Sequence, residues 1–326
     1  MNIAIDAMGG DKAPLEIVKG VYEAAKLRPN ITLTLLGDKT EIEKCLENHS
    51  ELSNLKIIHT NSFVTMEDDP MIVMKEKNDS SMAIGLNMLK NEEFDAFVSA
   101  GSTGALHAAS SLIVRRIKGI RRSAIATIIP FEKPILMLDS GANPTVTADI
   151  LNQWAILGSV YMNKMLNIEN VRVGLLNNGT EEHKGTPEAQ EAYQLLKNND
   201  KINFVGNIES KELPNSPCDV LITDGFTGNI TLKLLEGMAK FFFGSLKKVY
   251  TTNIKTKISY LLAKNDLKSL KKSFDSSKYG GAPLLGLAKP VIKAHGSSDA
   301  VDITNAIMQA IEYVETGIIQ RVIESL

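Results

Sequence analysis

The sequence predicts a three-layer α/β/α fold with a mostly parallel sheet. Short runs rich in aliphatic and β-branched residues alternate with longer segments of helical periodicity, beginning with an apolar run at 3–7 and a helical pattern from Pro14. Turn residues follow most of these runs, so the chain can leave the sheet at each strand end. Such alternation is typical of parallel sheets that are covered by helices on both faces.

The individual elements follow from these patterns in chain order. Strands are expected at 3–7, 31–36, 56–59, 96–99, 124–128, 135–138, 171–176, 202–205 and 220–223. Helices are expected from Pro14, from Lys39 and over 147–164, and a last helix should begin at the capping residues Ser298 and Asp299. No linker rich in Pro, Gly or Ser marks a boundary, so we expect residues 1–326 to form a single domain.

Residues 226–272 depart from the alternation because they contain no strand pattern. Apolar residues recur there at helical spacing among many lysines, which predicts two consecutive helices protruding from the α/β domain. We interpret this helical pair as a dimer interface or buried core, in preference to a membrane contact, although both uses can coexist.

Composition excludes several functional classes. The net charge is -2, with 36 Lys and Arg against 38 Asp and Glu, so nothing suggests a nucleic-acid-binding surface. Cys45 and Cys218 are far apart and lack metal-ligand spacing, which argues against a disulfide framework or a zinc site. The first residues lack the features of a signal peptide, so a cytoplasmic protein is expected. The uncharged stretch 96–114 contains too many small polar residues for a membrane span.

Two glycine loops come early in the chain. The loop at 6–11 offers Asp6, Gly9, Gly10 and Asp11 after the first strand, but it lacks the G-x-G-x-x-G pattern of a dinucleotide site, and a tight turn explains it equally well. The loop at 99–105 enters a helix, where Ser102, Thr103 and Gly104 are suited to cradle a phosphate. This second loop lacks the lysine of a nucleotide-hydrolysing P-loop, and an ordinary capped helix start is the alternative.

Two further loops follow strands in the middle of the chain. Asp139 and Asn143 flank a glycine turn at 139–144, which turn chemistry alone can explain. The loop at 177–185 combines amides, acids, an imidazole and a cation. In it, Lys184 can hold a phosphate or an oxyanion, whereas His183 is better explained as an exposed neighbour. The remaining candidate binding residues of this loop are Asn177, Gly179 and Thr180.

Three more loops lie in the last third of the chain. The loop at 223–229 precedes the helical pair, and we expect it to place Asp224 and Asn229 at the entrance of the same cleft. Another glycine loop covers 279–286. At 295–299, a His-Gly-Ser-Ser turn can donate hydrogen bonds to an anion at a helix start. Its candidate residues are His295, Gly296 and Ser297, although His295 taken alone is equally well explained as a histidine with its hydrogen bonds satisfied at a strand end.

Most of these seven loops follow predicted strands, where ligands bind in open α/β sheets, so they predict a cleft for an anionic substrate. Covalent catalysis is not the first choice, because neither a nucleophile elbow nor a zinc-protease motif is present.

The loops at 6–11, 177–185, 224–229, 279–286 and 295–298 resemble, in order and spacing, the motifs of the PlsX family of acyl-acyl-carrier-protein:phosphate acyltransferases. The resemblance covers nearly the whole chain. It implies a fold similar to isocitrate and isopropylmalate dehydrogenases and to phosphotransacetylases, and a homodimer without a metal or nucleotide cofactor. It also implies peripheral association with the inner face of the cytoplasmic membrane, with the tips of the helical pair as the contact.

The same resemblance implies a reaction and its partners. A long-chain fatty acyl group passes from acyl carrier protein to inorganic phosphate, and the downstream glycerol-phosphate acyltransferase is a further candidate partner. In this interpretation Ser102, Thr103, Gly104 and residues 295–297 help to bind phosphate, and Lys184 and Asn229 stabilise charge. Asp224 orients the phosphate or accepts its proton.

Three alternatives remain open. A phosphotransacetylase that uses coenzyme A thioesters shares the reaction type, and a non-catalytic scaffold that binds carrier protein at a membrane belongs to another class. A dehydrogenase shares the fold, but the missing dinucleotide fingerprint and acidic metal cluster disfavour it.

Overall fold

Two β-sheets form the core of the computed structural model, which describes residues 1–274 and 276–326. Within these residues the first sheet has the order β3-β2-β1-β4-β12-β11-β5, and the second has the order β6-β7-β10-β8-β9. The strands of the first sheet are β1 (Asn2–Asp6), β2 (Thr32–Gly37), β3 (Leu55–His59), β4 (Ala96–Ser99), β5 (Ala124–Ile125), β11 (Ala282–Leu285) and β12 (Val291–Lys293). Those of the second are β6 (Thr127–Ile129), β7 (Ile135–Leu138), β8 (Arg172–Asn177), β9 (Asn203–Glu209) and β10 (Val220–Ile222).

Most neighbouring strands run parallel. β1, β2, β3, β4 and β12 form one parallel block, and β7, β8, β9 and β10 form another. β11 runs antiparallel to β12 and β5, and β6 runs antiparallel to β7. The predicted, mostly parallel α/β fold is therefore confirmed, with antiparallel strands confined to the middle of the molecule.

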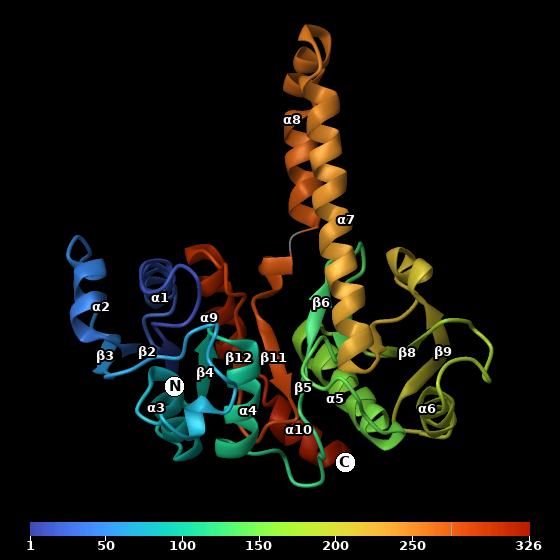
Figure 1. Cartoon of the computed structure of the whole chain (residues 1–326), viewed down its shortest axis with the longest axis horizontal. Coiled ribbons are helices and arrows are strands. Elements are labelled where there is room, and N and C mark those ends of the chain that lie inside the picture. The colour runs from blue at the N-terminus through green and yellow to red at the C-terminus, as the bar shows by residue number, and fades with distance from the viewer. Residues whose placement is uncertain (275) are drawn as a thin grey trace.

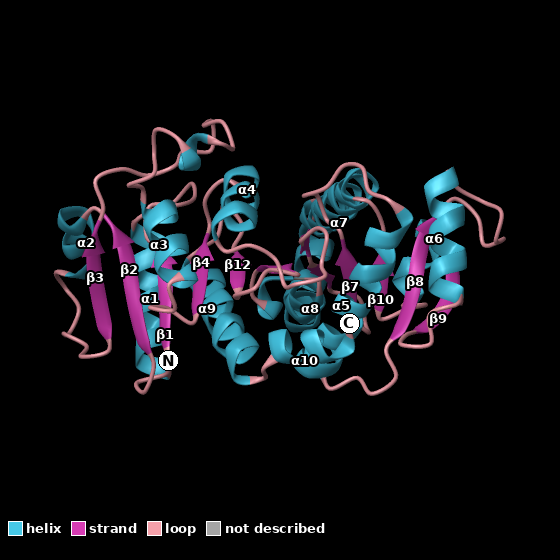
Figure 2. Ribbon diagram, turned by 90° about the horizontal axis from the view of Figure 1, so that it is seen from below, coloured by secondary structure: helices cyan, strands magenta, loops and turns pink. Residues whose placement is uncertain are grey.

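Helices cover both faces of the sheets, as Figure 2 shows. They are α1 (Leu15–Leu27), α2 (Lys39–Leu46), α3 (Ser81–Lys90), α4 (Thr103–Ile113), α5 (Ala148–Leu166), α6 (Pro187–Lys197), α9 (Ala300–Glu315) and α10 (Ile318–Ser325). Alternate residues of β1 show why both faces need a cover, because Ile3 and Ile5 pack into one apolar cluster and Ala4 into another. Short 3₁₀ helices lie at Ile72–Met74, Ser210–Asn215 and Ser276–Tyr279.

The expected strand at 124–128 is wrong as a single element. The structure divides it at Ala126 into β5, which pairs with β11 of the first sheet, and β6, which pairs with β7 of the second. Ala126 donates its backbone N–H to the carbonyl of Pro283 at 3.0 Å, so the chain passes from one sheet to the other without leaving the core.

The end of the chain holds elements that the sequence did not predict. β11 lies inside the expected glycine loop at 279–286, and β12 immediately precedes the loop at 295–299. The predicted last helix is present as α9, which Asp299 caps by accepting hydrogen bonds from the backbone of Val301 and Asp302. A further helix, α10, follows it.

The predicted helical pair is confirmed as α7 (Gly225–Thr251) and α8 (Ile254–Ser273). Figure 1 shows both helices extending far beyond the sheets on one side of the molecule.

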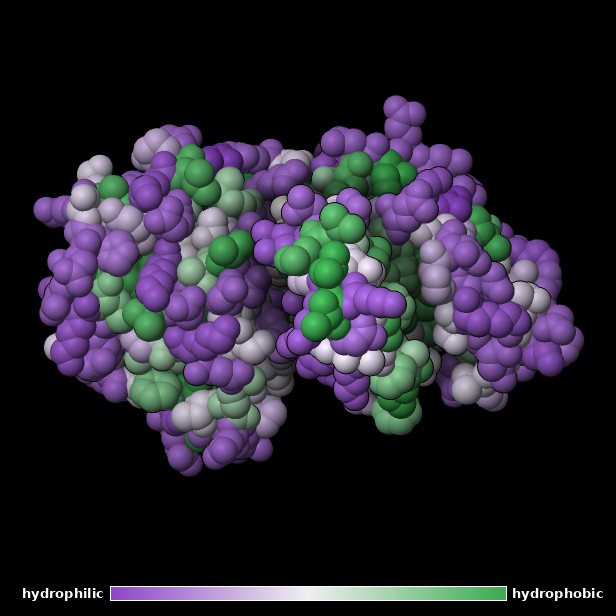
Figure 3. All heavy atoms as spheres, turned by 90° about the horizontal axis from the view of Figure 1, so that it is seen from above, coloured by the Kyte–Doolittle hydropathy of each residue, from purple (hydrophilic) through white to green (hydrophobic). Residues whose placement is uncertain are grey.

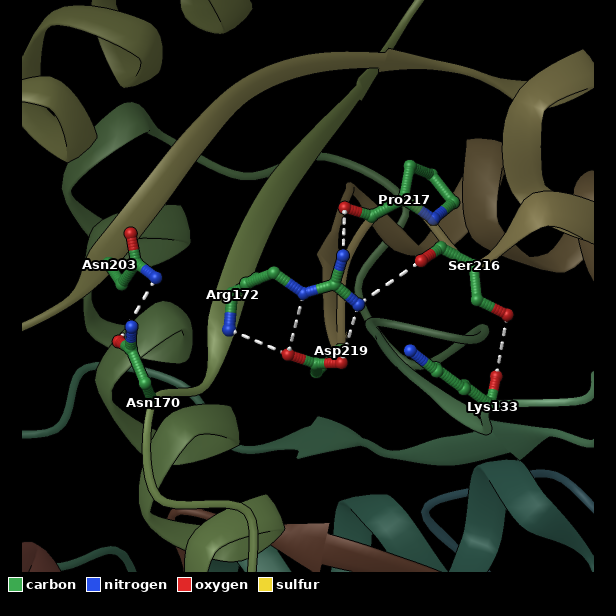
Figure 4. Close-up of polar contacts among 7 residues, drawn as sticks. All are labelled: Lys133, Asn170, Arg172, Asn203, Ser216, Pro217 and Asp219. Atoms are coloured by element: carbon green, nitrogen blue, oxygen red, sulfur yellow. Dashed lines mark hydrogen bonds and ion pairs between the residues drawn. The ribbon is translucent and has the colours of Figure 1, made fainter.

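Arg172 fastens the start of β8 to the turn before β10 (Figure 4). Its guanidinium forms two hydrogen bonds with the Asp219 carboxylate, at 3.1 and 2.8 Å, and donates to the backbone carbonyls of Ser216 and Pro217. Because Asp219 is nearly buried, this paired charge fixes the register between two strands that carry candidate site loops.

Candidate active site

Three of the predicted loops meet at the carboxyl ends of β1, β4 and β12, which are neighbours in the first sheet. The Asp11 backbone N–H donates to the Gly296 carbonyl at 2.8 Å, which joins the loop at 6–11 to the loop at 295–299. Gly10 has φ +106°, and a Cβ there would lie 3.0 Å from the Gly296 oxygen and 3.1 Å from the Ala100 Cβ. Only glycine suits a backbone that is both left-handed and this closely packed.

Asp6 anchors this meeting point from below. It is buried and accepts hydrogen bonds from Ser81 Oγ at 2.6 Å, Ser99 Oγ at 2.7 Å and the Met8 N–H at 3.2 Å. Burial raises the pKa of Asp6, and the bonds from Ser81 and Ser99 oppose that rise. Because both of its carboxyl oxygens have protein partners, Asp6 holds the loops in place more directly than it can contact a ligand.

The N-terminus of α4 faces outward beside these loops. Ser102 caps the helix by accepting from the Ala105 N–H at 3.5 Å, and Thr103 and Gly104 are exposed in its first turn. The free N–H groups and the helix dipole make such an end attractive to anions. A Cβ on Gly104 would come within 3.2 Å of Pro70 Cγ, and one on Gly296 within 3.3 Å of Met66 Cε, so residues 66–70 lie over these two glycines.

His295 and Ser297 form a small polar turn at the edge of the same group. The Ser297 N–H donates to His295 Nδ1 at 3.2 Å, and the Ser297 hydroxyl lies 2.9 Å from the same nitrogen. Both residues are exposed, so they can also turn toward a bound anion.

Lys293, at the end of β12, is a functional candidate that the sequence did not reveal. Its side chain is buried, and its ammonium donates to the Ala100 carbonyl at 3.2 Å and to the Ala294 carbonyl. Burial lowers the pKa of Lys293 to about 8, while the charges of Asp6 and Asp11 oppose that change. The sequence did contain a signal for it, because Lys293 is the one charged residue in the otherwise apolar run 291–294, directly before the loop at 295–299.

Helix α4 links this first group of residues to a second one. One turn beyond its start, the His107 Nε2 lies 3.1 Å from the Ser123 hydroxyl. The Ser123 carbonyl in turn accepts from Asn143 Nδ2 at 2.8 Å. Since a helical turn rises by about 5.4 Å, the two groups are about one turn of α4 apart.

Asp139 organises the second group. It is fully buried and accepts from the backbone N–H groups of Gly141, Ala142 and Asn143 and from Asn143 Nδ2. The predicted site residues Asp139 and Asn143 therefore shape their loop through contacts with each other, with the loop backbone and with Ser123.

The start of α7 packs directly on the Asp139 loop. A Cβ on Gly228 would lie 2.0 Å from the Asp139 carbonyl oxygen, so the helix can approach this closely only with glycine there. Asn229 is exposed, and its side chain lies beside Gly141. Asp224 caps the helix, because its two carboxyl oxygens accept from the Thr227 N–H at 2.8 Å and the Thr227 hydroxyl at 2.7 Å.

The loop after β8 forms a third group, which is held together mainly by its own contacts. Asn177 Nδ2 donates to the Lys184 carbonyl at 3.1 Å, and a Cβ on Gly179 would lie 2.9 Å from Lys184 Cγ. Thr180 is exposed and Lys184 is half-buried. Among the residues that the structure describes, no hydrogen bond joins this loop to the other two groups, although β8 lies next to β10.

The arrangement offers what an anionic substrate needs. Figure 2 shows α4 and α7 facing each other across the middle of the molecule, each beginning at a glycine loop. The N-terminus of α4 and the ammonium of Lys293 supply positive potential at the first group, and the exposed Asn229 offers an amide at the start of α7. In the described part of the chain, no cluster of three or more His, Cys, Asp or Glu residues is placed to hold a metal ion.

None of the helices described in residues 1–274 and 276–326 has the combination of length and apolar character needed to cross a bilayer.

Known proteins resemble this chain in sequence and in fold. The family model described as fatty acid synthesis protein matches residues 1–321. The phosphate acyltransferase of Thermoanaerobacterium thermosaccharolyticum is 46% identical over 323 residues, which cover 99% of this chain and 96% of that protein. A Streptococcus pyogenes phosphotransacetylase has a similar fold, with a TM-score of 0.64 at 18% identity, covering 97% of this chain and 94% of that one. A Salmonella typhimurium structure described as a 4-hydroxythreonine-4-phosphate dehydrogenase has a TM-score of 0.51 at 11% identity, covering 95% and 98%.

Proposed function

Because this chain belongs to the fatty acid synthesis protein family and is a phosphate acyltransferase, we propose that it transfers a long-chain fatty acyl group from acyl carrier protein to inorganic phosphate. The acyl-phosphate product then serves phosphatidic acid synthesis, and the enzyme works at the inner face of the cytoplasmic membrane. The downstream glycerol-phosphate acyltransferase is the natural recipient of that product.

The observation that carries this proposal is the convergence of three loops at the start of α4. Phosphate binds there between the N–H groups of Thr103 and Gly104, the Ser102 hydroxyl and the turn at 295–297. Lys293 lies beneath and adds a positive charge, and its direct hydrogen-bond partners among the described residues are the carbonyl oxygens of Ala100 and Ala294. Asp6, Gly9, Gly10 and Asp11 keep the loops at the required spacing.

The chemistry is a direct displacement at the thioester. A phosphate oxygen attacks the carbonyl carbon, and the new C–O bond gives a tetrahedral intermediate in which the former carbonyl oxygen carries the negative charge. When this intermediate collapses, the C–S bond breaks and the carrier leaves as a thiolate that takes up a proton. Lys184 and Asn229 stabilise the oxyanion of the intermediate. Asp224 orients the phosphate side of the reaction by fixing the start of α7, since Thr227 already engages both of its carboxyl oxygens.

The helical pair serves two further contacts in this proposal. Apolar side chains at 226, 230, 234, 238 and 241 form an exposed stripe along α7, which a second copy of this chain covers in a homodimer. Ile254, Ile258, Leu261 and Leu262 are exposed nearer the tip, where they insert into the membrane surface. Figure 3, which looks onto the helical pair from above, shows hydrophobic side chains gathered at its end.

Lysines accompany the apolar residues of the pair. A groove of about 580 Å³ between α7 and α8 is lined by Phe243, Leu246, Lys247, Tyr250, Thr251, Lys257, Tyr260, Leu261, Lys264, Leu267, Lys268 and Lys271. Its five lysines favour proximity to anionic lipid headgroups.

The test is to incubate the purified protein with phosphate and long-chain acyl carrier protein. Release of the carrier thiol and of hydroxylamine-trappable acyl-phosphate, both dependent on phosphate, is the expected result. The coenzyme A thioester of the same acyl chain serves as the control for donor choice. Turnover of the coenzyme A thioester alone would favour a phosphotransacetylase-type enzyme, and no product from a folded dimer would favour a carrier-binding scaffold.

A further inference from the structure

The loop between α4 and β5 carries a concentration of positive charge that the catalytic proposal does not use. No Asp or Glu occurs from residue 96 to residue 131, although the whole chain has a net charge of -2. Within that stretch, one loop holds five exposed basic residues, which we call the basic loop: Arg115, Arg116, Lys118, Arg121 and Arg122.

Little of this charge is neutralised. Arg121 pairs with Asp149 at 2.7 Å. Among the described residues, the other four basic side chains have no ion pair. Exposed charges of one sign that lack local partners form a surface that attracts an oppositely charged partner.

The end of the basic loop at Arg122 adjoins the second group of candidate residues. Arg122 directly precedes Ser123, whose hydroxyl lies 3.1 Å from His107 Nε2 and whose carbonyl accepts from Asn143. Burial lowers the pKa of His107, and the charges of Arg122 and Arg116 lower it further, so the field of the basic loop reaches into the site.

The basic loop also lies away from the helical pair. In Figure 1 it joins α4 to β5 at the lower edge of the molecule, whereas α7 and α8 extend from the upper side. A partner bound at the basic loop therefore does not compete with contacts made by the tip of the helical pair.

We propose that the basic loop is the docking surface for an acidic carrier protein that presents the acyl thioester to the site. This inference rests on the proposed function, because it assumes a protein-bound donor. Five exposed charges spread along the eight residues 115–122 match an extended acidic protein surface better than a single phosphate group. The position of the loop, opposite the helical pair, also separates it from the proposed lipid contact.

The test reverses two charges that have no contact with the candidate site. The Arg115→Glu and Lys118→Glu double variant is compared with the native enzyme in steady-state kinetics with acyl carrier protein and with the matching coenzyme A thioester. We expect KM for the protein-bound donor to rise about tenfold or more, while kcat stays within about twofold. Raising the ionic strength should weaken the native enzyme's affinity for the carrier more than the variant's.

The matched control changes the same amount of charge elsewhere. Lys56→Glu with Lys90→Glu alters two exposed lysines on β3 and α3, and it should leave both KM values unchanged. If the double variant at the basic loop has the native KM for acyl carrier protein, the docking surface lies elsewhere. An equal loss with both donors would also overturn the proposal, since a docking contact affects only the protein-bound donor.

This outcome is separable from failure of the proposed function. If the native enzyme makes acyl-phosphate from acyl carrier protein and the basic loop variant does so equally well, only the docking proposal fails. If the native enzyme makes none, the function itself fails.

Discussion

Lys293 combines burial with a position beneath the proposed phosphate site, so its protonation should control phosphate affinity. Its pKa of about 8 means that the ammonium is charged at pH 7 and loses its charge as the pH rises through about 8. We expect Lys293→Gln to raise KM for phosphate about tenfold at pH 7, because a hydrogen bond from a charged group contributes about 1.5–3 kcal/mol. The native KM should rise further above pH 8, and this step should be missing in the variant.

The comparison with the Lys293 variant separates the titration of Lys293 from that of phosphate, because phosphate titrates in the assays of both proteins.

Deprotonation of Lys293 should affect folding stability in the opposite direction to phosphate affinity. Because the folded pKa lies below the ordinary value of 10.5, the unfolded chain binds more protons between about pH 8 and 10.5, and folding becomes more favourable as the pH rises there. Identical pH profiles of KM in the two proteins would rule out a role for the charge of Lys293.

Lys184 is proposed to act in the transition state, so its loss should appear in kcat. We expect Lys184→Ala to lower kcat about 10²-fold with a smaller change in KM for phosphate, as for other groups that stabilise an oxyanion. Lys197→Ala is the control, because Lys197 is exposed and pairs with Glu182 of the same loop at 2.7 Å. Full activity of the Lys184 variant in a single-turnover assay would remove this residue from the mechanism.

For individual residues, the sequence predicted which side chains lie in the site loops better than it predicted what each of them does. The glycine loops identified Asp6 and Asp139 as candidates, and both lie at the predicted strand ends. Their burial and their hydrogen bonds to serine hydroxyls and backbone N–H groups depend on neighbouring strands that are distant in sequence, such as β1 and β4. The role of Lys293 could not be predicted for the same reason, because its contacts depend on the pairing of β12 with β4.

At the scale of elements, the contact between α7 and the Asp139 loop depends on Gly228. We expect Gly228→Ala to abolish most activity and to destabilise the fold by about 1–3 kcal/mol, because the added methyl group would overlap the Asp139 carbonyl. Chemical denaturation and the acyl-phosphate assay measure the two effects.

Glu236→Ala, in the same helix but off the apolar stripe, is the matched control for this prediction. Glu236 is exposed and pairs only with the exposed Lys233 among the described residues, so the change should keep activity and alter the free energy of unfolding by less than about 1 kcal/mol. Equal behaviour of the two variants would show that the close approach at Gly228 does not matter.

The Arg172 cluster joins β8 to the turn before β10 (Figure 4), so its effect should be on stability. We expect Arg172→Ala to lower the free energy of unfolding by about 3 kcal/mol, because it leaves Asp219 as a nearly buried, unpaired carboxylate. Arg321→Ala breaks an exposed pair with Glu324 and should cost less than about 1 kcal/mol. Urea unfolding of both variants measures these changes. Equally small losses of unfolding free energy would contradict the structural role of Arg172.

The sequence located most elements because hydrophobic periodicity is a local property. It failed at β11 and β12, which are short and lie among glycines and prolines, and at β5 and β6, whose shared apolar run hides the change of sheet at Ala126. Strand order is set by packing between distant segments, so it could not be predicted from the local pattern.

At the scale of the whole molecule, the stripe along α7 should hold two copies together. Leu234 and Met238 are 63% and 54% exposed in the single chain, which is unusual for large apolar side chains on one helix face. We expect Leu234→Asp with Met238→Asp to convert a dimer into a monomer in analytical ultracentrifugation. A dimer that persists unchanged would place the interface elsewhere.

The tip of the helical pair should behave independently of that interface. Leu262 is 83% exposed, and we expect Leu262→Asp to weaken binding to vesicles that contain anionic lipids while the protein remains dimeric. Co-sedimentation with vesicles measures this effect, and unchanged binding would contradict the proposed membrane contact.

The way the chain crosses between the sheets has a consequence for biosynthesis. Residues 127–222 supply every strand of the second sheet as one uninterrupted segment, whereas the first sheet needs strands from both ends of the chain. On the ribosome, the second sheet can therefore close while β4 still waits for β12, which emerges about two hundred residues after it. Until then the edge of β4 is unpaired and invites chaperone binding, so a translational pause between β4 and β12 should prolong chaperone association more than a pause of equal length before β4 is made.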